Sequence, residues 1–224
     1  MRCRRAAWLA AVAVAIGLGA GAVAPEPSDK ATSHRSFDDV EHWVSVFDDP
    51  TRDAWQKPEE VVRALAIEPG MTVADLGAGT GYFLPYLAAA VGQTGTVLAI
   101  ETEPNLLIHI GERAERARWT NVMPVLASAD DPRLPHGGVD RLLIVDTYHH
   151  LDDRVAYFRR AARALAPGGR IVIVDWQKRP LPVGPKLDHK LARTQVEHEM
   201  RRAGYDLLAA PDLLPHQYLL IFRR

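Results

Sequence analysis

Cysteine is nearly absent from this chain, which contains only Cys3 among its 224 residues. A disulfide within one chain is therefore excluded, and no spacing of Cys and His resembles a zinc site. The nine histidines are scattered, apart from the pair His149-His150. We therefore expect a domain that is stabilised by its hydrophobic core alone and that contains no metal centre.

An excess of basic residues is also missing. Lys and Arg number 27 and Asp and Glu number 28, which gives a formal net charge of −1. Such a chain has no positive field that would attract nucleic acid, and it contains no module that reads DNA or RNA. Nucleic acid is therefore not an expected partner.

Internal repeats are absent as well, and the composition does not change within residues 37–224. Apolar residues make up 47% of the chain and charged residues 25%, which are ordinary values for globular proteins. A length of 224 residues suffices for one well-buried domain and is short for two. We expect a flexible, polar linker at 25–36 and a single domain at 37–224.

The first 24 residues have the layout of a secretory signal peptide. A basic start precedes an uncharged run from Ala6 to Ala24, with small-x-small sites at Ala20-x-Ala22 and Ala22-x-Ala24. Cleavage after Ala22 is favoured, because Pro25 would follow a cut after Ala24. We expect export to the periplasm or the medium, with a net charge of −4 once three arginines and no acids are removed. The alternative is a retained membrane anchor with the domain in the cytoplasm, since the run is 19 residues long.

From residue 58 onward, apolar runs alternate with amphipathic stretches. Helices are predicted at 58–67, 82–92, 104–118, 153–169 and 186–205, and strands at 72–77, 95–101, 121–128, 139–146 and 170–176, with two more strands within 206–224. Apolar strands separated by helices are typical of a parallel sheet that is covered on both faces. We therefore predict an α/β, doubly wound, Rossmann-like domain.

Residues 37–57, which we call the cap, precede the first of these helices. Their apolar residues recur at helical spacing over 37–47, and Pro50 is expected to end that helix. Trp43 and Trp55 are expected to make core contacts. We predict that the cap closes over a bound ligand and shields the reaction from water.

The stretch "TVADLGAGTGYF", residues 72–83, places three glycines within five positions directly after the first strand. Glycine serves where the backbone turns with positive φ or approaches another group closely. A triphosphate-binding loop is excluded, because Tyr82-Phe83 stand where its lysine and hydroxyl residue would be. A dinucleotide loop would have its third glycine one residue later, although Glu101 supplies the expected acid about 20 residues on. Asp75 disfavours phosphate and suits a ligand with an amino or sulfonium group, such as S-adenosylmethionine.

Five ordered motifs then make a specific resemblance. "VADLGAGTGYF", "VLAIE", "ASADDPRLP", "VDRLLIVDTYHHL" and "ALAPGGRIVIVD" resemble the motifs of class I S-adenosylmethionine-dependent methyltransferases, and the resemblance covers about residues 58–224. It implies a seven-stranded sheet of order 3-2-1-4-5-7-6 whose last strand is antiparallel, with helices on both faces. It also implies S-adenosylmethionine as the cofactor.

The resemblance implies roles for individual residues. Asp75 and the loop residues would hold the methionine part of the cofactor: Gly77, Ala78, Gly79 and Gly81. Glu101 would bind the ribose hydroxyls, and Asp130 would face the adenine amino group. Asp146 would lie where the acceptor and the methyl group meet.

The segment "DTYHHL" suggests further candidates. His149 or His150 could accept a proton from an acceptor hydroxyl or amine, and Tyr148 could contact the substrate. The alternative is that these residues only pack or cap the following helix. Transfer from a sulfonium requires alignment more than acid–base help, because the leaving group is already good.

The segment "DWQKRPLPVGPKLDHK" lies where this fold often builds substrate specificity. Its cations could attract an anionic substrate or could simply form a solvated loop. They are Lys178, Arg179, Lys186 and Lys190.

Methyl transfer to an unknown, small-molecule acceptor is the function that the sequence favours. A Rossmann-type NAD-dependent oxidoreductase and a non-catalytic exported binding protein are the alternatives. A membrane is an expected partner only if the leader is retained. Export conflicts with a cofactor made in the cytoplasm, unless the leader is an anchor, the protein is exported already loaded, or the ligand is a different one.

Overall fold

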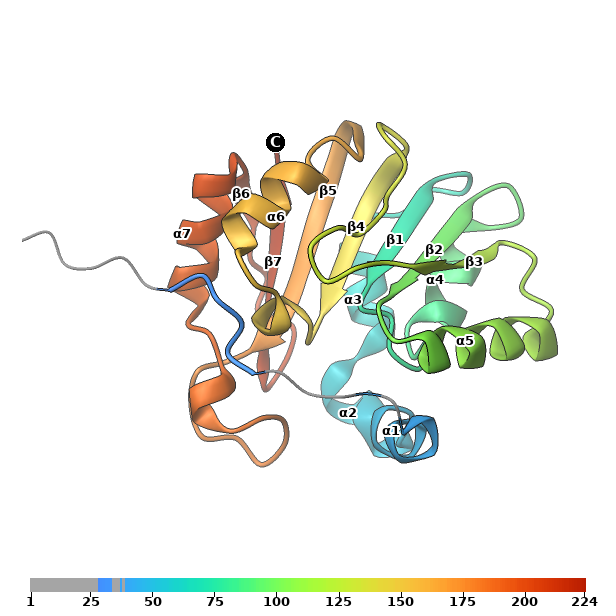
Figure 1. Cartoon of the computed structure of the whole chain (residues 1–224), viewed down its shortest axis with the longest axis horizontal. Coiled ribbons are helices and arrows are strands. Elements are labelled where there is room, and N and C mark those ends of the chain that lie inside the picture. The colour runs from blue at the N-terminus through green and yellow to red at the C-terminus, as the bar shows by residue number, and fades with distance from the viewer. Residues whose placement is uncertain (1–27, 34–36, 38) are drawn as a thin grey trace, which may run out of the picture.

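Seven strands form one sheet in the order β3-β2-β1-β4-β5-β7-β6 (Figure 1). The computed structural model describes residues 28–33, 37 and 39–224. Strand β7 runs antiparallel to both of its neighbours, and the other pairings are parallel. The predicted order and the antiparallel last strand are therefore confirmed. The strands are β1 Thr72–Leu76, β2 Thr96–Glu101, β3 Val122–Leu126, β4 Val139–Val145, β5 Leu165–Trp176, β6 Asp206–Ala209 and β7 Gln217–Arg223.

Helices cover both faces of the sheet. On one face the core is formed with α6 (Arg154–Ala161) and α7 (Arg193–Ala203). On the other it is formed with α3 (Pro58–Ala64), α4 (Leu84–Val91) and α5 (Pro104–Ala117). The last four residues of β4 form a continuous apolar run, because Leu142 and Ile144 pack on one face of the sheet and Leu143 and Val145 pack on the other.

The strand order reverses at β1: β2 lies on one side of this strand and β4 lies on the other. The carboxyl ends of β1 and β4 therefore border a crevice, which is where open α/β sheets bind ligands. This topology places the ends of both strands, and the loops that follow them, in one candidate site.

The cap contains more helix than its sequence predicts. Helix α1 (Val40–Phe47) matches the prediction, but the residues from Pro50 onward are helical and not irregular. A 3₁₀ turn, η1 (Pro50–Arg52), begins there and continues into α2 (Asp53–Gln56). The Asp49 side chain caps this turn by accepting a hydrogen bond from the backbone N–H of Thr51 at 2.8 Å. Proline at the first position of a helical turn is well tolerated, so it begins this element instead of only ending the previous one.

Two predicted helices are shorter than expected. Helix α6 ends at Ala161, and strand β5 already begins at Leu165, before the Pro-Gly-Gly sequence. The segment predicted to begin a helix at residue 186 forms a 3₁₀ turn, η3 (Leu187–His189), and α7 begins only at Arg193. The other 3₁₀ turn, η2 (Tyr148–His150), follows β4.

Residues 28–33, which we call the strap, bind to the α6–α7 side of the domain. The backbone carbonyl oxygens of Ser28 and Lys30 accept hydrogen bonds from the Arg154 guanidinium at 3.0 and 2.6 Å. The N–H of Thr32 donates to the carbonyl oxygen of His149 at 2.9 Å. The strap therefore connects the start of the described chain to the segment that follows β4.

The predicted leader (1–24) and half of the predicted linker (25–27 and 34–36) lie outside the described residues. Within the part of the chain that the structure describes, no helix combines the length and the apolar composition needed to cross a bilayer.

Candidate active site

The loop after β1 turns on its glycines. Gly77, Gly79 and Gly81 have φ angles of 74°, 58° and 85°, in the region that side chains other than glycine rarely adopt. A Cβ atom on Gly77 would also overlap the side chain of Thr147, which follows β4. The glycines therefore allow the loop to turn close to the end of β4.

Asp75, in β1, is a buried carboxyl group whose residue is only 3% exposed. Among the described residues, none donates a hydrogen bond to it. Burial, and to a smaller extent the Glu101 carboxylate, raise the pKa of Asp75 to about 7, against the opposing effect of the Arg52 guanidinium. A carboxyl group without a partner beside a glycine loop is suited to a cationic group of a ligand, such as an amino group.

Glu101 ends β2, and its carboxylate is fixed by backbone donors. One oxygen accepts from the N–H of Gly79 at 2.9 Å, and the other accepts from Thr102 at 2.7 Å and Glu103 at 3.1 Å. These bonds hold the carboxylate against the glycine loop. Because each carboxylate oxygen has two acceptor sites, the group retains capacity to accept from ligand hydroxyls.

Asp146 directly follows β4 and has a φ angle of 54°. Such left-handed backbone in a residue other than glycine is typical of functional sites. Its carboxylate accepts from Gln217 Nε2 at 2.6 Å and lies 3.6 Å from Arg52 Nη2. Burial raises the pKa of Asp146 to about 7, against the opposing effect of the Arg52 guanidinium.

The cap lies against this site from the side of the glycine loop. Asp48 accepts a hydrogen bond from the Thr80 hydroxyl at 2.8 Å and forms an ion pair with Arg113 at 2.9 Å. The Tyr82 hydroxyl donates to Asp53. The expected proximity of cap and loop is therefore present, and closure over a ligand stays a prediction.

Arg52 and Gln56 connect the cap to the carboxyl ends of the strands. The Arg52 guanidinium donates to Gln56 Oε1 at 3.1 Å and lies 4.1 Å from the centroid of the Tyr82 ring. The Gln56 amide donates to Gln217 Oε1 at 2.8 Å, and both glutamines are fully buried. Together with Asp146 these residues form a closed polar ring that the sequence prediction missed, because its members are far apart in the chain.

A second buried pair joins the ends of β4 and β5. The His149 ring Nδ1 lies 2.9 Å from Asp175 Oδ1, and the His149 backbone N–H donates to Asp175 Oδ2 at 3.2 Å. Burial disfavours charge on His149, but the Asp175 carboxylate outweighs burial and raises the pKa of the imidazole. Sequence reasoning missed Asp175, although its position at the end of an apolar strand was a usable signal.

Three other predicted site residues form hydrogen bonds with partners that are not part of this site. His150 Nδ1 lies 3.0 Å from the Ser33 hydroxyl of the strap. Tyr148 is buried in the core, where its hydroxyl donates to Glu199 at 2.9 Å, so this geometry favours a structural role over substrate contact. Asp130 is exposed and accepts from the Ser128 hydroxyl at 2.9 Å, so its adenine contact stays a prediction.

The assembled site places the carboxyl groups of Asp75, Glu101 and Asp146 and the Arg52 guanidinium around the carboxyl ends of β1, β2 and β4. Such carboxyl groups can bind a ligand that carries both a cationic group and hydroxyl groups. Within the described residues, no group of three or more His, Cys, Asp and Glu side chains is arranged to hold a metal ion.

Comparison with known proteins agrees with this chemistry. Residues 73–169 match a family model described as a methyltransferase domain. A ubiquinone/menaquinone biosynthesis C-methyltransferase from a Shewanella species is 28% identical over 141 residues, covering 62% of this chain and 49% of the relative. Phosphoethanolamine N-methyltransferase 3 from Arabidopsis thaliana is 28% identical over 174 residues, covering 74% of this chain and 35% of the relative. The chain thus spans about half the length, or less, of these curated relatives.

The fold also has counterparts among solved structures. A SAM-dependent methyltransferase from Aquifex aeolicus aligns with a TM-score of 0.79 and 24% identity, covering 84% of this chain and 98% of that one. A possible exported protein from Bordetella parapertussis aligns with a TM-score of 0.61 and 20% identity, covering 75% and 67% of the two chains. Both are likenesses of fold.

Proposed function

We propose that this chain, a class I S-adenosylmethionine-dependent methyltransferase, transfers the methyl group of that cofactor to a small-molecule acceptor. The observation that carries the proposal is that two carboxyl groups, those of Asp75 and Glu101, lie beside the same glycine loop. One carboxyl group is buried without a described partner, and the other is held against the N–H of Gly79. Domain match, fold and cofactor chemistry support the same conclusion.

The residues of the site fit the parts of the cofactor. Asp75 would pair with the amino group of the methionine part, which would stabilise the charged carboxylate. Glu101 would accept hydrogen bonds from the ribose hydroxyls, and the glycines would allow the ligand to approach the backbone of the loop closely. When bound, the cofactor supplies a methyl group on a positively charged sulfur, which leaves as a neutral thioether.

The acceptor would lie beside Asp146. The Arg52 guanidinium and the Gln217 amide hold the Asp146 carboxylate at the carboxyl edge of the sheet. The buried pair of His149 and Asp175 lies next along this edge, with the imidazole oriented by the carboxylate. In this arrangement the chain aligns the acceptor, and His149 would be available to accept a proton from it.

Calorimetry tests the proposal directly. We expect S-adenosylmethionine and S-adenosylhomocysteine, the demethylated product, to bind the full chain with micromolar affinity, and NAD not to bind. Asp75→Ala and Glu101→Ala should abolish binding. Glu112→Gln, which neutralises an exposed acid on α5, should leave it unchanged.

The result that overturns the proposal is equally clear. If neither adenosyl ligand binds while the chain is folded by circular dichroism, the resemblance is one of fold only. Binding of NAD with reduction of the nicotinamide would instead support the oxidoreductase alternative.

A further inference from the structure

The connection between β5 and α7 carries an unbalanced positive charge. Residues 177–190, which we call the basic loop, contain four cations and one acid: Lys178, Arg179, Lys186, Lys190 and Asp188. Among the described residues, no carboxylate forms an ion pair with any of these four cations within 4.0 Å. The domain as a whole is close to neutral, so this loop is a local positive feature at the carboxyl edge of the sheet.

Lys190 is the least expected of these cations, because it is only 2% exposed. Its ammonium group donates to the carbonyl oxygen of Arg179 at 3.0 Å and lies 6.0 Å from the centroid of the Trp176 ring. An ammonium group has three donors, and a carbonyl oxygen does not neutralise its charge. Burial without an anionic partner is costly, so the site favours a ligand that brings a negative charge.

Electrostatics at Lys190 agree with this geometry. Burial lowers the pKa of its ammonium group, and the Arg179 guanidinium lowers it further. Arg179 is itself bound only to neutral acceptors, Gln177 Oε1 at 2.7 Å and the Pro215 carbonyl oxygen at 2.9 Å. An anion placed near the two cations would favour the charged ammonium group and so oppose both effects on the pKa of Lys190.

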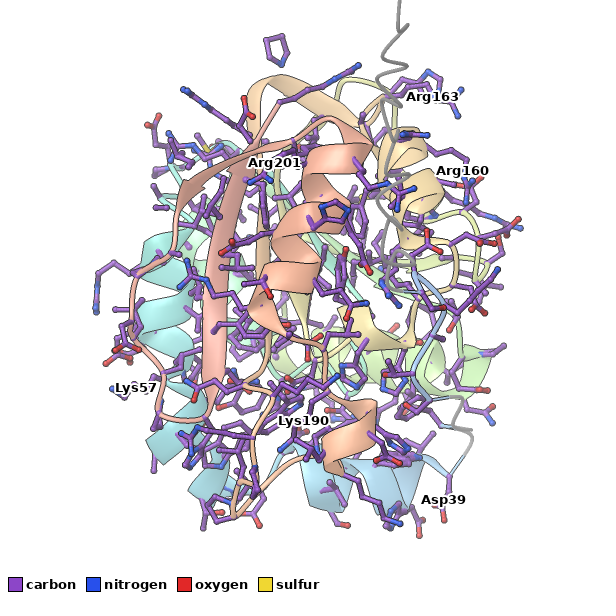
Figure 2. All side chains as sticks on the ribbon, turned by 90° about the vertical axis from the view of Figure 1, so that its left-hand side faces the viewer. Asp39, Lys57, Arg160, Arg163, Lys190 and Arg201 are labelled. Atoms are coloured by element: carbon purple, nitrogen blue, oxygen red, sulfur yellow. The ribbon has the colours of Figure 1, made fainter. Side chains whose placement is uncertain are left out.

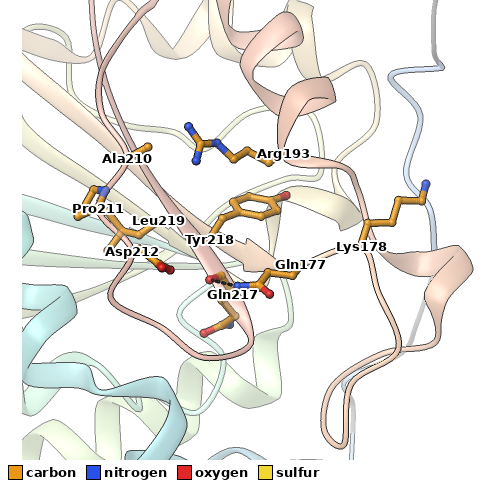
Figure 3. A pocket seen from close by; sticks show the side chains of 9 residues that line it. All are labelled: Gln177, Lys178, Arg193, Ala210, Pro211, Asp212, Gln217, Tyr218 and Leu219. Carbon is orange, nitrogen blue, oxygen red and sulfur yellow. Dashed lines mark hydrogen bonds between the residues drawn. The ribbon is translucent and has the colours of Figure 1, made fainter.

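A pocket of about 440 Å³ adjoins the basic loop at the start of β7 (Figure 3). Gln177 and Lys178 line one side, and Arg193 extends over it from the first turn of α7. Two carboxylates partly offset this charge: Asp212 lines the pocket, and Glu197 accepts from Arg193 at 2.6 Å. Among the described residues, Lys178 has no carboxylate partner.

The pocket is connected to both the basic loop and the proposed reaction centre. Gln177 lines the pocket and binds Arg179, and the hydroxyl of Tyr218, another lining residue, lies 3.5 Å from the carbonyl oxygen of Leu191. In the other direction, Gln217 lines the pocket and donates to Asp146 at 2.6 Å. A ligand group held in this pocket is therefore one side chain away from Asp146.

We propose that the basic loop and this pocket form the anion-binding half of the acceptor site, so that the methyl acceptor carries a carboxylate or phosphate group. Lys178 and Arg193, the cations that line the pocket, bind that group, and Lys190 contributes its positive charge from the adjoining basic loop. This inference rests on the proposed methyl-transfer function and names the substrate class of the same site. Charge-assisted hydrogen bonds to either anion would supply both affinity and orientation.

The test measures binding of two simple probes, benzoate and inorganic phosphate, to the full chain by ligand-detected NMR, with and without S-adenosylhomocysteine. Benzamide, which lacks the charge, is the ligand control. We expect at least one anion to bind and benzamide not to bind, and the preferred anion distinguishes a carboxylate from a phosphate acceptor. Lys178→Met should weaken anion binding by about tenfold or more, and Lys190→Met, which removes a charge from the adjoining loop, by about threefold.

The matched control is Arg201→Gln, which removes the same charge from the far end of α7, distant from Lys190 (Figure 2). It should change anion affinity by less than about twofold. Binding of S-adenosylhomocysteine should be unchanged in all three variants. If Lys190→Met does not fold, the exposed Lys178→Met decides the outcome.

Two results would overturn the inference: neither anion binds better than benzamide, or Arg201→Gln weakens binding as much as the lysine variants. Failure of the wild-type chain to bind S-adenosylhomocysteine, with anion binding intact, would instead refute methyl transfer and with it the acceptor role of the pocket. The two failures are therefore distinguishable.

Discussion

The Arg52 guanidinium of the cap lies 3.6 Å from the Asp146 carboxylate at the end of β4. The same guanidinium lowers the pKa of Asp75. One side chain of the cap therefore opposes the rise in pKa that burial causes at both Asp75 and Asp146. The cap thus contributes a positive charge to the site.

Replacing Arg52 should shift the pH dependence of cofactor binding. In Arg52→Gln the pKa of Asp75 should rise above its value of about 7, because the favourable charge is lost. Since a protonated Asp75 does not pair with a cationic amino group, the midpoint of S-adenosylhomocysteine affinity against pH should move upward, as calorimetry can measure. Arg113→Gln, which loosens the cap at Asp48 and Thr80 without facing these carboxyls, should leave the midpoint in place. An unmoved midpoint in Arg52→Gln would contradict this account.

Cofactor affinity itself should fall as the solution becomes acidic. Below about pH 7 the raised pKa of Asp75 leaves this group protonated in the free chain, so binding must first remove a proton. Affinity should then decrease by up to about tenfold per pH unit. Asp75→Asn should bind weakly at every pH, whereas Asp146→Asn should retain the pH dependence. A flat profile in the wild-type chain would show that Asp75 does not bind the cationic group.

The same carboxyl group should reduce stability at neutral pH. Its pKa is raised from 3.8 to about 7 by folding, so between these values the folded chain binds more protons than the unfolded chain. The free energy of unfolding should therefore decrease as pH rises through this window. Asp75→Asn removes the effect and should be more stable than the wild-type chain above pH 7, by up to about 4 kcal/mol. Urea unfolding at low and high pH measures the difference, which should vanish below the unfolded-state pKa.

Gly77 should tolerate no side chain. Gly77→Ala combines a left-handed backbone with overlap against Thr147, and we expect a loss of about 2–4 kcal/mol in the free energy of unfolding. Gly168→Ala is the matched control, because Gly168 has a similar φ of 78° and open space around its Cα. That variant should lose only about 1 kcal/mol. Equal losses by urea titration would mean that the contact with Thr147 is unimportant.

The buried amide pair of Gln56 and Gln217 should couple the cap to the sheet. Replacing either residue with Leu leaves the other amide without its 2.8 Å partner, at a cost of about 2 kcal/mol each. The double variant should lose less than the sum, with a coupling of about 1 kcal/mol or more in a double-mutant cycle. Additive losses would show that the two amides act independently.

Local patterns in the sequence located most of the strands and helices, because apolar runs and glycines depend on residues that are close in the chain. The strand order and the antiparallel β7 came instead from the resemblance to a known family, as did the roles expected of Asp75, Glu101 and Asp146. Side-chain pairs between distant segments, such as Gln56 with Gln217 and His149 with Asp175, are decided only by packing and could not be predicted in this way.

Motif position also predicts less about side-chain direction than about backbone placement. Tyr148 lies in the predicted segment after β4, but its ring stacks on Phe158 in the core, 5.3 Å between centroids. A hydrophobic ring with a buried hydrogen-bond partner gains more from the core than from an open site. The turns η1 and α2 escaped prediction for another reason: Pro50 was expected only to end a helix, whereas it also begins η1, which continues into α2.

The strap separates the cap from any load on the preceding chain. A pull at Ser28 would first act on the hydrogen bonds that its carbonyl oxygen accepts from Arg154 and Gln195, and Arg154 is bound in turn to Glu199 at 2.7 Å. Tension would enter the domain through α6 and α7 and not through the cap beside the glycine loop. A force applied at the amino-terminal side of the domain would therefore be carried by α6 and α7 before it reached the cap.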